Sequence, residues 1–137
     1  MRKRPSILND YINFVDTVTS DMTKNYDDFK DALDIMQEQG IEPSRLLTAS
    51  VGLSGEVGEF NDIVKKILFQ GKEITPELRE KLIKELGDVS WYWVNACTAL
   101  DISPYEVIQR NMNKLLERFP EGSFSVERSE NRSKNDG

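Results

Sequence analysis

The chain has 137 residues and a net charge of −6 at pH 7, with 38% hydrophobic and 31% charged residues, a composition typical of one globular domain without a membrane span. The acidic balance argues against nucleic acid as a general partner, because no basic stripe is available to neutralise phosphates. There is no histidine and one cysteine, Cys97, so histidine acid–base chemistry, disulfides and cysteine-rich zinc sites are excluded. Cys97 lies in an apolar segment and is expected to be a small buried side chain.

The first forty residues predict two helices. Ser6 is a candidate N-cap for a helix whose apolar residues run from Ile7 to Val18. A polar stretch follows, and a second helix is expected at residues 28–39, ended by Gly40. The basic start, residues 1–5, leads into no apolar run, so we expect no secretory signal and a cytoplasmic location.

The middle of the chain predicts two long helices. The first is expected to begin at Pro43 and to stop before Gly71. Thr75 and Pro76 have the residue types of an N-cap and first helical position for the second, which runs to about Leu100. Because the segment between them is short, we expect the two helices to form an antiparallel hairpin.

A last helix and a polar tail complete the chain. Ser103-x-x-Glu106 is a capping box with Pro104 at the first helical position, and Pro120 ends the helix. Residues 121–137 are expected to be an arm or a disordered end. No segment alternates with period two, so the predicted fold is an all-α antiparallel bundle of four to five helices over residues 1–120.

One short pattern occurs in both helices of the hairpin. It reads Glu-Val-Gly-Glu-Phe at residues 56–60 and Glu-Leu-Gly-Asp-Val at residues 85–89. Residues i and i+3 lie on one side of a helix, and both pairs flank the apolar stripe in the same way. The pairs lie roughly 15 and 14 residues from the centre of the turn, so their heights agree within about one turn. We therefore predict that four carboxylates converge: Glu56, Glu59, Glu85 and Asp88.

Four uncompensated carboxylates would repel one another and resist burial. A hard divalent cation resolves this conflict, and oxygen ligands suit Mg²⁺ or Mn²⁺. A single pair of this kind is weak evidence, because solvated helix faces often carry one, whereas two matching copies are stronger. Asp62 continues the first series, at a greater angle from the core.

Further candidates share the face of the carboxylates. Lys66 and Asn95 each lie seven residues past the second carboxylate of their helix and are candidate contacts for an anionic substrate, with a solvated face as the alternative. Gly52 and Gly55 lie on the same side, which indicates either close approach of a ligand or backbone, or easier helix packing. Tyr92 is on this flank too, and packing is its expected role.

On the last helix, Asn111, Lys114 and Arg118 share one face. Two cations so placed would repel unless an anion lay between them, so a phosphate partner is one interpretation. Pairing of the cations with Glu117 or Glu121 is the other.

At these residues the sequence resembles the MazG-like nucleoside triphosphate pyrophosphohydrolases, in the short single-domain forms of bacteria and phages. The family pattern E-x-x-E, spacer, E-x-x-D is present in the hairpin, and N-x-x-K-x-x-x-R follows at residues 111–118. The resemblance covers roughly residues 46–124, and the first forty residues match least.

The resemblance implies an Mg²⁺-dependent enzyme that hydrolyses ribo- or deoxyribonucleoside triphosphates to the monophosphate and pyrophosphate, on a helical fold that works as a homodimer or homotetramer. It implies that the four carboxylates are metal ligands. It also implies substrate contacts from further positions, which are Lys66, Asn95, Asn111, Lys114 and Arg118. An open acidic face that needs cover is a separate argument for an oligomer.

The mechanism expected from this resemblance is attack of a metal-activated water on the α-phosphorus. Because the chain lacks histidine, a carboxylate is the expected proton acceptor, and Glu59 is our choice. Two alternatives stay open, a non-catalytic acidic helical interaction module and a pyrophosphatase restricted to dUTP. Base and sugar preference, the number of metal ions and the choice between dimer and tetramer are not marked by any motif.

Overall fold

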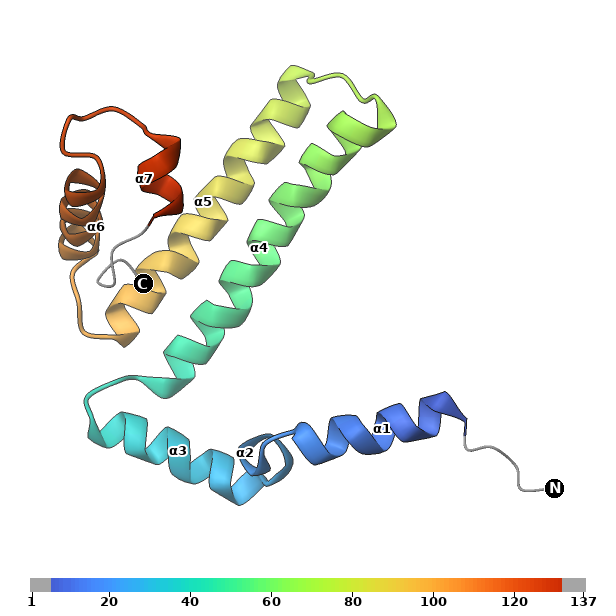
Figure 1. Cartoon of the computed structure of the whole chain (residues 1–137). Coiled ribbons are helices and arrows are strands. Elements are labelled where there is room, and N and C mark those ends of the chain that lie inside the picture. The colour runs from blue at the N-terminus through green and yellow to red at the C-terminus, as the bar shows by residue number, and fades with distance from the viewer. Residues whose placement is uncertain (1–5, 132–137) are drawn as a thin grey trace. The chain divides into compact units, whose positions relative to one another are not determined.

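The computed structural model describes residues 6–131, which form helices and no strand (Figure 1). The all-α prediction is therefore confirmed. The chain divides into two compact units, residues 1–39 and residues 40–137. The helices are α1 (Ile7–Val18), α2 (Asp21–Lys24), α3 (Tyr26–Glu38), α4 (Pro43–Gln70), α5 (Pro76–Ala99), α6 (Pro104–Arg118) and α7 (Val126–Glu130).

The first unit holds α1, α2 and α3. Ser6 Oγ accepts a hydrogen bond from the backbone N–H of Asn9 at 3.3 Å, so α1 begins at the predicted cap. The side chain of Asn25 accepts hydrogen bonds from the N–H groups of Asp27 and Asp28 at 3.0 and 3.3 Å. For this reason α3 begins at Tyr26, two residues before the expected start. The short α2 lies in the polar stretch, where no helix was predicted.

In the second unit, α4 and α5 lie side by side as an antiparallel hairpin (Figure 1). Gly71, which ends α4, has a φ of 63°, in the left-handed region that favours glycine. Thr75 Oγ1 accepts a hydrogen bond from the N–H of Leu78 at 3.2 Å, and Pro76 opens α5. The predicted hairpin and its caps are confirmed.

Small side chains pack where α4 begins and α5 ends. The backbone N–H of Glu42 donates to the carbonyl of Ala99 at 2.9 Å, which joins the two helices at this end. Ala49, Cys97 and Ala99 are buried, so the prediction for Cys97 is confirmed. Small residues at a helix interface allow the two backbones to approach closely.

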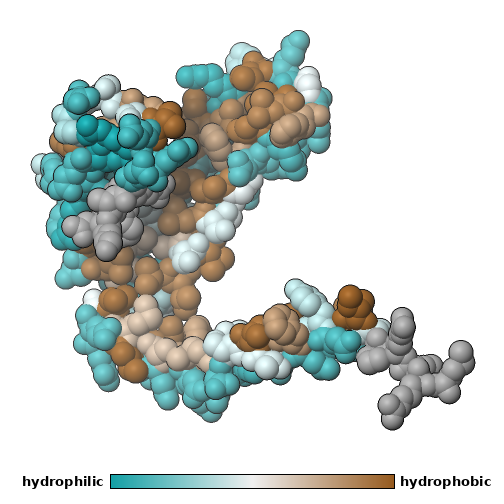
Figure 2. All heavy atoms as spheres, viewed as in Figure 1, coloured by the Kyte–Doolittle hydropathy of each residue, from teal (hydrophilic) through white to brown (hydrophobic). Residues whose placement is uncertain are grey.

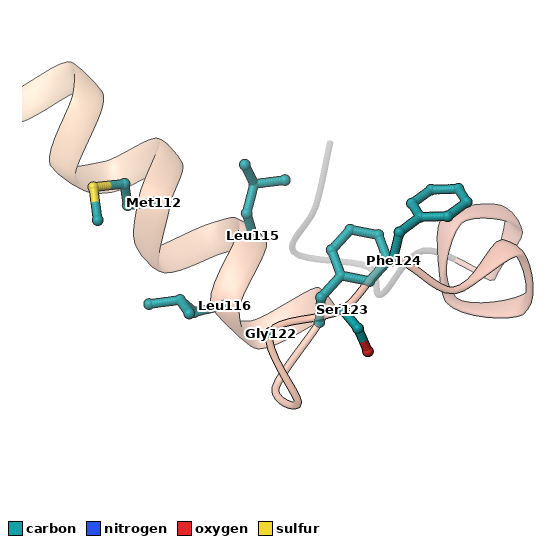
Figure 3. Close-up of a pocket in the computed structure, with 7 residues that line it drawn as sticks. Met112, Leu115, Leu116, Gly122, Ser123 and Phe124 are labelled. Atoms are coloured by element: carbon teal, nitrogen blue, oxygen red, sulfur yellow. The ribbon is translucent and has the colours of Figure 1, made fainter.

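Helix α6 contacts α5 within the same unit. Ser103 Oγ accepts a hydrogen bond from the N–H of Tyr105 at 3.2 Å and caps α6. Past its end, the rings of Phe119 and Phe124 lie 5.6 Å apart between centroids. They take part in an apolar groove between α6 and the following loop (Figure 3), lined by Met112, Leu115, Leu116, Phe119, Gly122, Ser123 and Phe124.

Part of the polar tail is helical. Ser125 Oγ accepts a hydrogen bond from the N–H of Arg128 at 3.4 Å and caps the short α7. Within the expected tail, residues 126–130 are therefore helical, with a local serine cap at the start of the turn. Residues 132–137 lie outside the described part of the chain.

Large apolar side chains reach the surface in both units (Figure 2). In the second unit, Val57 and Leu86 belong to the apolar stripes beside the carboxylates, yet their side chains are 47% and 52% exposed. Among residues 6–131, no helix combines the length and the apolar character needed to cross a membrane. The hairpin of a single chain therefore leaves part of its apolar surface in contact with water.

Candidate functional site

Three carboxylates meet on one face of the hairpin. Glu56 and Glu59 come from successive turns of α4, and Glu85 comes from α5. One carboxylate oxygen from each of them lies within 4.8 Å of the others. Helices α4 and α5 therefore pack so that the two copies of the motif lie at the same height along the hairpin, as their distances from the turn predict.

Asp88 is exposed and does not belong to this group of three, although the sequence places it in the same set. Its charge still acts on the group. The pKa of Glu56 is raised above its usual range, first by desolvation and then by the negative charges of Glu59, Asp88 and Glu85. The carboxylates therefore repel one another when all of them are ionised.

The donor set fits a hard divalent cation. Carboxylate oxygens are the ligands that Mg²⁺ and Mn²⁺ prefer, and a cation among them would offset the repulsion that, after desolvation, raises the pKa of Glu56. Cys97, the one thiol of the chain, is buried between helices, and the chain has no histidine. A soft-metal site with sulfur or imidazole ligands is therefore not available here.

Asp62 pairs with two lysines of its own helix. Its Oδ1 lies 2.8 Å from Lys65 Nζ, and its Oδ2 pairs with Lys66. Hydrogen bonds from Lys65 and then Lys66 lower the pKa of Asp62 from its ordinary value of 3.8 to about 2. Asp62 therefore already pairs with cations, and Lys66, a predicted substrate contact, is its partner in a half-buried ion pair.

Beyond the carboxylates, the ring of Tyr92 lies over Gly52. A Cβ at Gly52 would lie 2.1 Å from Cε1 of Tyr92, so only glycine leaves room for the ring. A Cβ at Gly55 or Gly58 would meet nothing within 4 Å. The close approach expected from the sequence occurs at Gly52 alone of these three, and the group that approaches is a side chain.

Asn95 is held by the protein at the far end of this face. Its Oδ1 accepts a hydrogen bond from Arg45 Nη1 at 3.1 Å, and its Nδ2 donates to the carbonyl of Trp91 at 3.0 Å. Arg45 Nε also donates to Glu42 Oε2 at 2.5 Å. Arg45 was not among the residues predicted for this face from the sequence. Its distance of seven residues from Gly52, close to two helical turns, is the signal that places it on the same face.

The predicted phosphate contacts of α6 lie on a different helix from the carboxylates. Asn111 and Lys114 are exposed, and α6 packs on α5. The guanidinium of Arg118 lies over the Phe119 ring, 5.9 Å from its centroid. Glu121, one of the alternative partners for these cations, pairs with Arg128 at 3.6 Å. The contacts of the described residues do not bring Asn111 or Lys114 to the carboxylates of their own chain.

Comparison with known families gives a match to the MazG nucleotide pyrophosphohydrolase domain over residues 45–123. This span is more than half of the chain and contains both carboxylate pairs. Gene 37 protein of Mycobacterium phage L5 is a relative, 47% identical over 75 residues, which cover 53% of this chain and 65% of that protein. The match therefore spans slightly less than two thirds of the relative. No solved structure matches the chain.

Proposed function

This chain belongs to the MazG nucleotide pyrophosphohydrolase family, and we propose that it hydrolyses nucleoside triphosphates to nucleoside monophosphates and pyrophosphate with the help of Mg²⁺, or of Mn²⁺ in its place. The observation that carries the proposal is the convergence of Glu56, Glu59 and Glu85 within 4.8 Å. These residues come from the two copies of the repeated motif, and both copies lie inside the family match.

In this proposal the four carboxylates of the motif hold the cation. Glu56, Glu59 and Glu85 are already close, and Asp88 joins them by a change of its exposed side chain. When bound, the cation lowers the pKa of water and neutralises charge on the phosphates. The carboxylates serve to fix its place on the hairpin and to orient the triphosphate beside it.

Glu59 is the proposed general base. It is the exposed member of the group, while Glu56 and Glu85 are half-buried, so water reaches it most readily. The oxygen of water bonds to the α-phosphorus, the bond from this phosphorus to the oxygen shared with the β-phosphorus breaks, and pyrophosphate leaves. Glu59 accepts the proton of the attacking water.

Cationic and amide side chains are proposed to hold the rest of the substrate. Lys66 lies on the carboxylate face, and its contact with Asp62 keeps it there before substrate binds. Asn111, Lys114 and Arg118 lie on α6, and we propose that they bind phosphate oxygens, supplied by the α6 of a second copy. We propose that Asn95, which lies seven residues beyond Asp88 and accepts a hydrogen bond from Arg45, contributes through that arginine at the nucleoside end.

Exposed apolar surface supports the proposal of a second copy. Among the described residues, the buried hydrophobic side chains are Ala49, Cys97 and Ala99, and many large apolar side chains stay exposed. Patches of that kind are typical of protein–protein contacts. We propose a homodimer or homotetramer in which neighbouring helices cover the acidic face.

The test is product analysis after incubation with a panel of ribo- and deoxyribonucleoside triphosphates, with Mg²⁺ and with EDTA. We expect the products to be monophosphate and pyrophosphate, and we expect them to form in the presence of Mg²⁺ but not of EDTA. Glu56→Gln is expected to lower turnover by at least about 100-fold, the upper end of what losing an outer-shell partner of a metal ligand costs.

Glu80→Gln is the matched control, because Glu80 is an exposed carboxylate of α5 outside the group. Diphosphate and orthophosphate as products would contradict the assignment of the cleaved bond. No turnover of any nucleotide would favour the acidic interaction module. Normal turnover of Glu59→Gln with Mg²⁺ bound would remove Glu59 as the base.

A further inference from the structure

The carboxylate face continues in one line toward the beginning of α4 and the end of α5. On α5, Tyr92 and Asn95 lie four and seven residues beyond Asp88, so they stand about 6 and 10 Å further along the helix axis. On α4, Gly52 lies under the Tyr92 ring and Arg45 reaches Asn95. The order along the hairpin is therefore carboxylates, aromatic ring, guanidinium.

The guanidinium of Arg45 is fixed in place and its charge is compensated. It donates through Nε to Glu42 at 2.5 Å and through Nη1 to Asn95 at 3.1 Å. Asn95 is itself held by the carbonyl of Trp91. These bonds use two of the five N–H donors of an arginine, and neither uses Nη2. The side chain is 44% exposed, so a ligand on this face can reach it.

Compensation by Glu42 decides what kind of group Arg45 suits. A free guanidinium attracts phosphate, whereas one paired with a carboxylate offers mainly the geometry of its donors. A neutral group with two adjacent acceptors matches that geometry. A nucleobase is such a group, and a phosphate is less favoured because the carboxylate of Glu42 would repel it.

Tyr92 occupies the level between the carboxylates and Arg45. Its ring is held against Gly52 on one side, and it packs edge-on against Trp91, with centroids 4.7 Å apart and planes at 83°. Flat aromatic side chains contact sugars and bases without regard to base identity. Discrimination between bases would therefore come from the next level.

We propose that Arg45 selects the base of the bound nucleotide and favours guanine, an inference that rests on the proposed function because phosphates at the carboxylates direct the base toward Arg45. Guanine presents the acceptors O6 and N7 side by side, which a guanidinium binds with two parallel hydrogen bonds. Adenine presents an amino group in place of O6, so one of the two bonds is lost. Glu42 and Asn95 act as positioning residues for the guanidinium.

The test measures binding and turnover separately on the full chain. Equilibrium binding is compared for dGMP and dAMP in the presence of Mg²⁺, and kcat/KM is compared for dGTP, 7-deaza-dGTP and dATP. The wild type is expected to bind dGMP about tenfold or more tightly than dAMP, as a bidentate base contact gives. Removal of N7 in 7-deaza-dGTP is expected to lower kcat/KM toward the value for dATP.

Arg45→Lys and Arg45→Gln are expected to bring the ratio of dGMP to dAMP affinity close to one. The lysine variant keeps the charge and loses the fork, so a loss in both variants identifies donor geometry as the cause. Arg110→Gln is the matched control, because Arg110 is likewise paired with a glutamate, Glu106, but on α6 rather than on the α4–α5 hairpin. It is expected to keep the wild-type ratio.

Equal binding of dGMP and dAMP by the wild type would overturn the proposal, as would a ratio that Arg45→Lys leaves unchanged. Failure to bind either nucleotide would overturn it as well. Arg45-dependent binding of dGMP without turnover of any triphosphate would support the base contact and count against the proposed hydrolysis. Turnover of all triphosphates without base preference would support the proposed hydrolysis and count against the base contact.

Discussion

At the scale of single residues, charge separates two kinds of acidic side chain on α4. Glu56 lies among other carboxylates, and its pKa is raised by desolvation and by their charges. Asp62 lies two turns further on beside Lys65 and Lys66, and its pKa is lowered. The carboxylates around Glu56 therefore lack a nearby positive charge and suit a bound cation. The carboxylate of Asp62 is already compensated by two lysines.

Glu56→Gln should make the metal-free protein more stable. The amide removes one negative charge from a group whose members repel, so the melting temperature in EDTA is expected to rise above that of the wild type. The rise in melting temperature that Mg²⁺ gives the wild type is expected to shrink in the variant, because a ligand is lost. Glu80→Gln should leave both values close to wild type, and a lower melting temperature for Glu56→Gln in EDTA would contradict the repulsion argument.

Asp62 should titrate at about pH 2 in the folded protein. A lowered carboxylate pKa favours the folded state at pH values above the unfolded pKa, and this contribution is lost as the pH falls from about 4 to about 2. Lys65→Gln is expected to raise the pKa of Asp62 toward 3.8, since Lys65 gives the largest lowering effect. Carboxyl NMR titration measures both values, and an unchanged pKa in the variant would show that the ion pair is absent in solution.

At the scale of elements, the α4–α5 hairpin is the rigid support of the site. Gly71 and Thr75 close one end through a left-handed residue and a side-chain cap. At the other end, the bond from Glu42 to Ala99 and the small buried side chains hold the helices together. Functional groups on regular elements keep their relative positions better than groups on loops, so the carboxylates and Arg45 share one fixed frame.

Gly52→Ala and Gly55→Ala should act in opposite directions. A Cβ at Gly52 would meet the Tyr92 ring, so overpacking is expected to cost about 1–3 kcal/mol. A Cβ at Gly55 meets nothing within 4 Å, and alanine there is expected to stabilise the helix by about 1 kcal/mol. Urea unfolding at one protein concentration measures both. A stabilising Gly52→Ala would show that Tyr92 leaves this position at little cost.

Tyr92→Ala provides the check on that interpretation. If the ring is the cause of the penalty, Gly52→Ala should lose most of its effect in the Tyr92→Ala background, which a double-mutant cycle reports as coupling. Additive effects of the two substitutions would place the penalty elsewhere.

At the scale of the whole molecule, a single chain leaves large apolar side chains in contact with water. Val57 and Leu86 beside the carboxylates, and Leu116 on α6, are each about half exposed. Water around such surface is unfavourable by roughly 25 cal/mol per Å², so association that covers it is favoured. In the oligomer proposed above, α6 of one copy lies at the acidic face of another and contributes its cations there.

The chain is therefore expected to be a dimer or tetramer in solution. Leu116→Glu, which places a charge in the groove of Figure 3, is expected to shift the protein toward smaller species in light scattering coupled to size-exclusion chromatography. Glu117→Gln is the control, as an exposed polar residue of the same helix. A wild-type monomer at micromolar concentration would contradict the proposed oligomer.

The features that depend on neighbours along the chain could be predicted from the sequence. The caps at Ser6, Thr75 and Ser103 and the stop at Gly71 are local hydrogen-bonding and backbone preferences, and all were predicted at the right residue. The meeting of the two acidic motifs was predictable too. Helical period and a short turn together set the height and the side of each carboxylate.

Which side chains meet across the hairpin depends on how α4 and α5 pack against each other. Arg45 and Asn95 are 50 positions apart, and Tyr92 covers Gly52 but leaves Gly55 open. The packing of the two helices also leaves Asp88 outside the group formed by Glu56, Glu59 and Glu85. Such contacts depend on the distance between the two helix axes and on the rotation of each helix about its own axis. Small changes in either one decide whether two side chains touch. A residue pattern specifies a helix face, whereas packing against the second helix selects the few side chains of that face that touch.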